Sequence, residues 1–188
     1  MKIAMPLATL SLLALAACVS NGASDTPTTD EDTPTTYDAM LERAGELKEK
    51  IGAAAEQEVA TQTGTATYNG IAGFALDQDA NPTYLSNIVL NANFDTSTIG
   101  GSLSNFRDAE DNTFAGAVEL ENGGLTGVDF GASLVGQVTV GETVYNASGN
   151  ISGEFSGSGA EYASGLVSIN LGAGGEYGGY FGAEKAEK

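Results

Sequence analysis

The spacing of apolar residues changes along the chain and divides it into four parts. Residues 1–17 contain an apolar run from Leu7 through Ala17, 18–36 are almost wholly polar, 37–61 have helical spacing, and 62–188 mostly alternate with a period of two. A short apolar run preceded by Lys2 is typical of a cleaved export signal, whereas a membrane-spanning helix needs about 20 apolar residues. The pattern therefore predicts an exported protein with one folded domain.

The segment 37–61 is predicted to form an amphipathic helix. Its apolar residues fall alternately four and three positions apart and so share one side of a helix: Met40, Ala44, Leu47, Ile51 and Ala54. We expect Asp38 as the N-cap, and Glu46 with Lys50 as a favourable i,i+4 pair. Two glycines each cost about 1 kcal/mol relative to alanine, so we expect the stripe to be stabilised by packing on the domain that follows.

The remainder, 62–188, is predicted to form eight strands. In the longest, apolar or small residues keep one face through Val128, Phe130, Ala132, Leu134, Gly136, Val138 and Val140. Turns are expected at Asn81-Pro82, Gly100-Gly101, Asn122-Gly123-Gly124, Gly141-Glu142 and Gly172-Ala173-Gly174-Gly175. The expected strands are 63–76, 84–95, 97–107, 113–121, 125–140, 143–155, 161–171 and 176–182.

Short connections between these strands imply antiparallel neighbours, and eight such strands close into a small barrel without exposed edges. The expected fold is therefore all-β: an eight-stranded antiparallel up-and-down β-barrel, preceded by a disordered tether and one short amphipathic helix. The 26 glycines, nearly all after residue 63, fit a strongly bent sheet. A membrane-embedded barrel is the competing interpretation. It is disfavoured because polar residues and glycines occur on both faces, without a continuous apolar band.

Composition excludes several kinds of chemistry. The chain has no histidine and a single cysteine, which removes the usual general base and any intrachain disulfide. Its net charge of −18 repels phosphate backbones, so we expect no nucleic-acid partner. The polar stretch 18–36 has too little apolar content to fold and is predicted to be a tether with a reach of about 25 Å.

The single cysteine follows the apolar run directly, in Leu15-Ala16-Ala17-Cys18. Small residues before a cysteine at this place resemble the lipobox of bacterial lipoproteins. The resemblance implies cleavage after residue 17 and acylation of Cys18, which would make the lipid the attachment to the membrane. Val19 stands where retention at the inner membrane would require Asp, which favours the outer membrane. An ordinary cleaved signal with an incidental cysteine is the alternative.

Three segments of the second half resemble the β-barrel domain of transferrin-binding protein B-like surface lipoproteins. They are TATYNGIAGF (65–74), ISGEFSGSGA (151–160) and EYGGYFGAEK (176–185). The resemblance covers about 62–188 and implies a lipid-anchored, soluble barrel displayed at the cell envelope. Receptors of that family have two lobes, each with a second β domain. This chain has room for one barrel, so transferrin is not implied as its ligand.

Core packing is the preferred interpretation of the aromatic residues in and between these segments. We expect Phe74, Phe94, Phe130, Phe155 and Phe181 to point into the barrel. Tyr162, Tyr177 and Tyr180 could instead ligate haem iron or stack on a ligand, although tyrosines at a barrel rim are commonly structural.

Two acidic segments have some features of a calcium site. Asp77, Asp79 and Asn81 have the opening spacing of a calcium-binding loop, but Pro82 replaces the glycine of that loop and Ile88 its bidentate glutamate. A second acidic loop contains Asp108, Glu110, Asp111 and Asn112. Polar turns are the preferred interpretation of both, and we expect no bound metal or cofactor.

Two functional classes remain, and neither is enzymatic. Gly131-Ala132-Ser133 lacks the framing of a nucleophile elbow, and a Ser-His-Asp triad is impossible without histidine. We expect a lipid-anchored outer-membrane protein that binds or displays, with a protein or small solute as ligand. The alternative is a structural acidic surface lipoprotein without a specific ligand. Fold alone does not decide between them.

Overall fold

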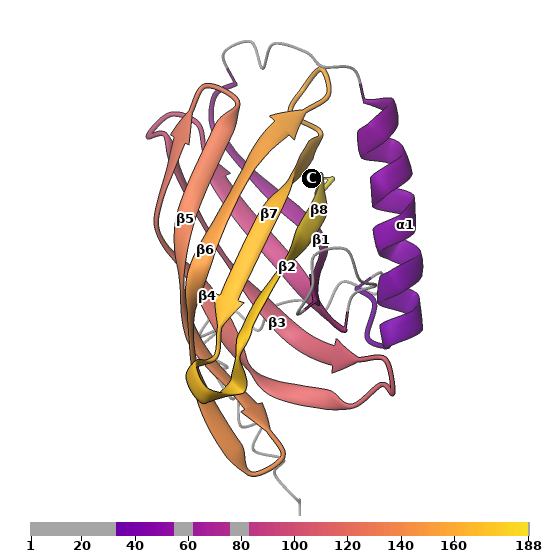
Figure 1. Cartoon of the computed structure of the whole chain (residues 1–188). Coiled ribbons are helices and arrows are strands. Elements are labelled where there is room, and N and C mark those ends of the chain that lie inside the picture. Colours follow the sequence, from indigo (N-terminus) through magenta and orange to yellow (C-terminus); the bar gives the residue numbers. More distant parts are fainter. Residues whose placement is uncertain (1–32, 55–61, 76–82, 188) are drawn as a thin grey trace, which may run out of the picture. The chain divides into compact units, whose positions relative to one another are not determined.

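The structure is a computed structural model that describes residues 33–54, 62–75 and 83–187. One helix precedes eight strands (Figure 1). Their bounds are α1 Tyr37–Ala53, β1 Thr65–Ala75, β2 Tyr84–Asn93, β3 Thr98–Asp108, β4 Thr113–Thr126, β5 Asp129–Val140, β6 Thr143–Ser156, β7 Tyr162–Asn170 and β8 Glu176–Lys185. A 3₁₀ turn, Gly172–Gly174, connects the last two strands.

The eight strands form a closed antiparallel barrel in sequence order, as predicted. Closure is made by β1 and β8, which pair from Tyr68 with Lys185 to Ala75 with Gly178. The resembling segments 65–74 and 176–185 are therefore hydrogen-bonded neighbours. Every strand has two partners, so no strand edge is left for pairing with another chain.

Alternation along the strands fills the barrel with apolar side chains. In β2, for example, Ile88, Leu90 and Ala92 are all buried and belong to the interior cluster. Phe74, Phe130, Phe155 and Phe181 are buried there too, which confirms four of the five predicted aromatic anchors, while Phe94 packs against them only partly buried. Ring contacts join these residues, with Phe130 and Phe155 centroids 4.9 Å apart.

Two of the predicted turns are wrong, and both are irregularities within strands. Gly101 lies in β3, where the register with β4 shifts, and its φ of 147° brings it against the carbonyl of Val89. Asn122 (φ 53°) lies in β4 at a second register shift, and the chain turns only after Thr126. Asn-Gly and Gly-Gly pairs allow left-handed backbone in a turn or in a bulge, and the paired strands on both sides make these positions bulges.

The helix α1 packs on the outside of the barrel through its predicted stripe. Met40 and Leu47 are fully buried, and they pack with the outward-facing Ile71 of β1 and Leu85 of β2. A side chain at position 182 would approach Ile51, so glycine there lets the helix lie close to β8. Figure 1 shows α1 running beside β1 and β8.

Three details of the helix differ from the prediction. The N-cap is Thr36, whose hydroxyl accepts from the Ala39 N–H, and Asp38 lies in the first turn instead. The helix ends at Ala53, and 55–61 lie outside the described residues. Lys50 does not pair with Glu46 but bonds Glu184 of β8, because the barrel places this carboxylate within its reach.

Glu184 joins the helix to the barrel through two cations. Its carboxylate accepts from Arg43 at 2.8 Å and from Lys50 at 2.8 Å. Partial burial opposes ionisation of this carboxyl, but hydrogen bonds from Lys50 and Arg43 outweigh it and lower the pKa of Glu184. The acidic residue of the C-terminal segment therefore holds the helix against β8.

Candidate functional site

One end of the barrel contains a cavity of about 200 Å³. It lies where β1, β3, β5 and β7 end and where β2, β4, β6 and β8 begin. Its lining is formed by Phe74, Tyr84, Phe106, Phe114, Val138, Val140, Tyr145, Ile169, Leu171, Gly174 and Tyr177. Phe74, Phe106, Val138 and Ile169 are buried, and the other lining residues are partly exposed or exposed. The cavity is therefore a cup with a buried apolar floor and a partly exposed rim.

Aromatic rings form much of the cavity wall. Tyr84 of β2 lies edge-on to Phe114 of β4, with ring centroids 5.6 Å apart, and edge-on to Tyr177 of β8 at 5.3 Å. The Tyr177 hydroxyl donates to the Gly174 carbonyl at 2.9 Å, which fixes its ring against the β7–β8 connection. Such edge contacts hold these rings of the cavity lining in defined orientations.

The surroundings of the cavity are negatively charged. Burial raises the pKa of Tyr84, and Tyr177, Asp108 and Glu110 raise it further. Asp108 ends β3, and its carboxylate accepts from the backbone N–H groups of Glu110 and Asn112. Burial opposes ionisation of Asp108, but hydrogen bonds from the Asn112 side chain and from the backbone of the turn together outweigh it and lower the pKa of Asp108. This side of the cavity rim therefore carries negative charge.

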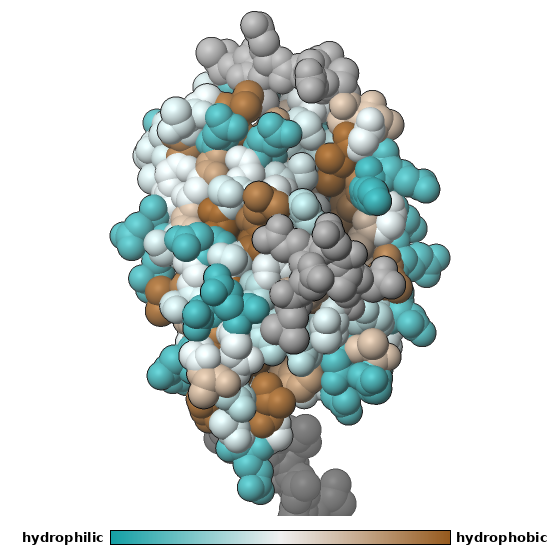
Figure 2. Space-filling view, viewed as in Figure 1, coloured by the Kyte–Doolittle hydropathy of each residue, from teal (hydrophilic) through white to brown (hydrophobic). Residues whose placement is uncertain are grey.

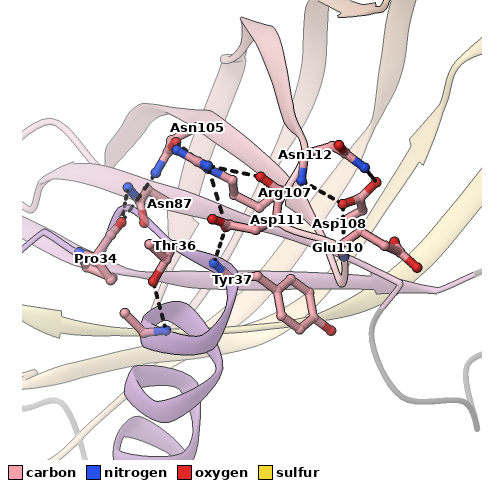
Figure 3. A network of polar contacts seen from close by, with 11 residues as sticks. Pro34, Thr36, Tyr37, Asn87, Asn105, Arg107, Asp108, Glu110, Asp111 and Asn112 are labelled. Carbon is pink, nitrogen blue, oxygen red and sulfur yellow. Dashed lines mark hydrogen bonds and ion pairs between the residues drawn. The ribbon is translucent and has the colours of Figure 1, made fainter.

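A polar network fixes the start of the helix at the same end of the barrel (Figure 3). The Pro34 carbonyl accepts from the side-chain amides of Asn87 and Asn105, and the Tyr37 N–H donates to the Asp111 carboxylate at 2.8 Å. Arg107 also bonds Asp111. Pro34, in the last part of the segment predicted as a tether, is thus held on the barrel.

The structure places the second acidic loop in the β3–β4 turn. Asp108 is engaged by the backbone of its own turn, and Asp111 by Tyr37 and Arg107. Within the described residues, no group of three or more acidic or cysteine side chains is arranged to hold a metal ion. The first acidic loop, with Asp77, Asp79 and Asn81, lies outside the described residues.

The three candidate tyrosines do not form one site. Tyr177 lines the cavity, whereas Tyr162 begins β7 at the opposite end and pairs with Glu184. Tyr180 is 62% exposed on the outside of β8, opposite Leu166 of β7. Only Tyr177 is therefore placed to contact a ligand in the cavity.

Cys18 and Ser133 are two further residues that the sequence singles out. Cys18 lies outside the described residues, so its acylation stays a prediction. Ser133 faces outward from the middle of β5 while its neighbour Ala132 is buried in the core. In the described part of the chain, no helix combines the length and apolarity needed to cross a membrane.

The positions of the aromatic residues in the sequence contain a signal for the cavity. Six aromatic residues lie near strand ends beside alternate connections of the barrel, namely Phe74, Tyr84, Phe106, Phe114, Tyr145 and Tyr177. Alternate connections of an up-and-down barrel meet at one end. Aromatic residues beside these connections therefore come together at that end of the barrel. The alternation of apolar and polar residues within each strand does not reveal this.

Apolar side chains on the outer surface are more scattered. On the face drawn in Figure 2, brown apolar groups are interspersed with white and teal ones. Large exposed side chains occur on several elements, including Leu41 of α1, Val135 of β5, Val144 of β6 and Leu166 of β7. Single exposed apolar residues are ordinary on protein surfaces. The cavity is therefore the stronger candidate for ligand binding.

Comparisons with solved structures find matches that cover the barrel. The barrel is similar to part of transferrin-binding protein B. A point mutant from Haemophilus parasuis Hp5 matches at TM-score 0.44 and 18% identity over 72% of this chain and 29% of that one. A double mutant from the same organism matches at a TM-score of 0.45 and 16% identity, over 72% of this chain and 28% of that one. The isotype 1 protein from serogroup B Neisseria meningitidis matches at a TM-score of 0.45 and 19% identity, over 69% of this chain and 26% of that one.

The strand pairing of this chain itself shows the closed eight-stranded barrel that the sequence segments suggested. The chain spans between a quarter and a third of the length of each of these structures. No family model matches it, and no curated protein does. The ligand must therefore be argued from the cavity of this chain.

Proposed function

We propose that this chain is a lipid-anchored, non-enzymatic binding protein of the bacterial cell envelope, which holds a small ligand in the cavity at one end of its barrel. The observation that carries the proposal is the aromatic cup of about 200 Å³, where the core packing of the barrel stops. A concave, mostly apolar pocket with a few polar groups is the usual form of a small-molecule site.

The anchor is supported by the leader alone. Cys18 follows an apolar run and two small residues. Mass spectrometry of the mature protein tests this: we expect a chain that begins at residue 18 with acyl groups on its cysteine. Cys18→Ser should leave the protein unlipidated. A mature chain with a free thiol would refute the anchor.

The outer-membrane location is a separate part of the proposal. Protease treatment of intact cells, followed by immunoblotting, distinguishes display at the cell surface from a periplasmic orientation. Partition of the protein with the inner membrane on density-gradient fractionation would contradict an outer-membrane location. Neither result bears on whether the cavity binds a ligand.

Ligand binding is tested with indole as a neutral apolar probe. We expect saturable binding to the purified protein, and loss of it in Val140→Trp, because Val140 lines the rim of the cavity. Val144→Trp in the same hairpin is the matched control, since Val144 is 57% exposed and does not line the cavity. Equal binding by both variants would show that indole is bound elsewhere.

A structural surface lipoprotein without a specific ligand remains the second candidate, and the net charge of −18 is what favours it. Under that function the cavity would be an incidental packing gap. Absence of binding to every small apolar probe, together with an unchanged envelope location, would support this alternative.

A further inference from the structure

We propose that the cavity takes a small aromatic amine, with the ring in the aromatic cup and the ammonium group at the acidic rim. The inference rests on the proposed binding function and narrows it to a chemical class. It is carried by three properties of this end of the barrel: the size of the cavity, its aromatic lining, and the charges around it.

The size of the cavity favours a single or fused ring. A protein cavity of about 150 Å³ with apolar walls accommodates benzene. The present cavity, of about 200 Å³, is larger by roughly the volume of a second fused ring or a short side chain. A long acyl chain or a large macrocycle exceeds this space.

The lining favours a flat ring over a branched aliphatic group. Tyr84, Phe114 and Tyr177 form a chain of edge contacts, and the buried Phe74 and Phe106 lie together with ring centroids 6.4 Å apart. An inserted ring can stack on or meet these rings edge-on. A cation over such ring faces is attracted as well.

The charges around the rim select against an anion. Asp108 and Glu110 belong to the β3–β4 turn and act on Tyr84 in the cavity wall, and Glu142 lies in the β5–β6 turn between the lining residues Val140 and Tyr145. In the described residues of these two turns and their flanking strand ends, the one cation is Arg107, which already pairs with Asp111. A carboxylate ligand would be repelled here, whereas an ammonium group would be attracted.

Three probes with the same ring test the charge selection. Tryptamine carries an ammonium group, indole is neutral, and indole-3-acetate carries a carboxylate. The chain contains no tryptophan, so indole fluorescence reports the probe alone. We expect the dissociation constants to rise from tryptamine through indole to indole-3-acetate, with a blue shift of probe emission on binding.

Substitution of the rim carboxylates tests whether their negative charges attract the ammonium group of the ligand. A single charge several ångströms from an ammonium group in a water-like dielectric contributes about a threefold factor in affinity. Glu110→Gln and Glu142→Gln should each weaken tryptamine binding by about threefold at low salt and leave indole binding unchanged. Glu121→Gln is the control, because Glu121 lies on β4 away from this end.

The possible outcomes distinguish a wrong ligand class from the absence of any binding in the cavity. Equal affinity for all three probes, or tighter binding of indole-3-acetate, would overturn the aromatic-amine class while leaving the cavity as a binding site. Tryptamine binding that responds equally to Glu121→Gln and Glu110→Gln would also overturn it, since general charge would then explain the attraction. Failure of all three probes to bind would remove the proposed binding function itself.

Discussion

At the scale of single residues, the barrel interior tolerates polar atoms where the backbone supplies partners for them. Tyr68 is fully buried, and its hydroxyl donates to the carbonyl of Ala160 at 2.8 Å. Ala160 has a φ of 51°, so this hydrogen bond also holds the β6–β7 turn in a conformation that alanine seldom adopts. One phenol therefore links the core to a strained turn.

Removal of this phenol should destabilise the protein. Tyr68→Phe leaves the Ala160 carbonyl without its donor, and we expect the free energy of unfolding in urea to fall by about 1–2 kcal/mol. Burial raises the pKa of Tyr68 above its ordinary value of 10.0. Its contribution to stability is therefore present below pH 10 and is lost as the pH rises above that value, when the unfolded chain ionises. An unchanged alkaline stability profile in Tyr68→Phe would contradict this.

The opposite effect is expected at Ser86 on β2. Its side chain is fully buried, and its hydroxyl has no hydrogen-bond partner in the described part of the chain. Ser86→Ala removes this desolvated group, and we expect stability in urea to rise by about 1 kcal/mol. Ser133→Ala on the outer face of β5 is the control and should change stability by less than about 0.5 kcal/mol. A clear loss of stability in Ser86→Ala would show that the hydroxyl is satisfied.

At the scale of elements, the helix α1 is stabilised by the barrel. Its fully buried side chains, Met40 and Leu47, contact outward-facing residues of β1 and β2. An isolated helix of 17 residues with two glycines is marginal in water. Its stability therefore depends on the apolar contact and on the ion pairs with Glu184.

A matched pair of leucines tests the apolar contact. Leu47→Ala should destabilise the docked helix by about 2–3 kcal/mol, measured by hydrogen exchange of the α1 amides. Leu41 is 46% exposed on the same helix, so Leu41→Ala should have an effect of about 0.5 kcal/mol or less. Equal effects of the two substitutions would mean that α1 does not pack on the barrel through the described stripe.

The ion pairs make helix docking sensitive to acid. Because the pKa of Glu184 is lowered below its ordinary value of 4.5, its contribution is present above that pH and is lost as the pH falls below it. Glu184→Gln should cost about 1 kcal/mol at pH 7, and the difference from the natural protein should shrink towards pH 3. Glu46, which is 54% exposed and bonds only Arg43 in the described structure, provides the control Glu46→Gln. A pH-independent difference would contradict the assignment.

At the scale of the whole described domain, the two ends of the barrel differ. The cavity, the acidic β3–β4 turn and the point where the chain joins the barrel at Pro34 all lie at one end or close to it. At the other end, the buried Tyr68 bonds the Ala160 carbonyl of the β6–β7 turn. If Cys18 carries lipid, the anchored segment would enter the barrel near its cavity end.

This arrangement predicts which end lies nearer to the membrane. In the lipidated protein Cys18 would be blocked by its acyl group, so a cysteine introduced at Glu142 or at Asp129 would be the one free thiol for a fluorescent label. On vesicles with a headgroup quencher, the label at Glu142 should be quenched more strongly than the label at Asp129, because a short tether limits the distance of the cavity end. Stronger quenching at Asp129 would reverse the orientation.

The sequence determined the elements of this protein, and the tertiary structure decided the irregularities and the site. Alternation with a period of two defined eight strands, and helical spacing defined the buried side of α1, because both depend on local geometry. The bulges at Gly101 and Asn122 could not be predicted, because these residues suit a strand or a turn until the neighbouring strands fix the register. The partner of Lys50 could not be predicted either, because Glu184 comes within its reach only when the helix packs on the barrel. The aromatic cavity depends on barrel closure, because only closure brings the ends of all eight strands around one space.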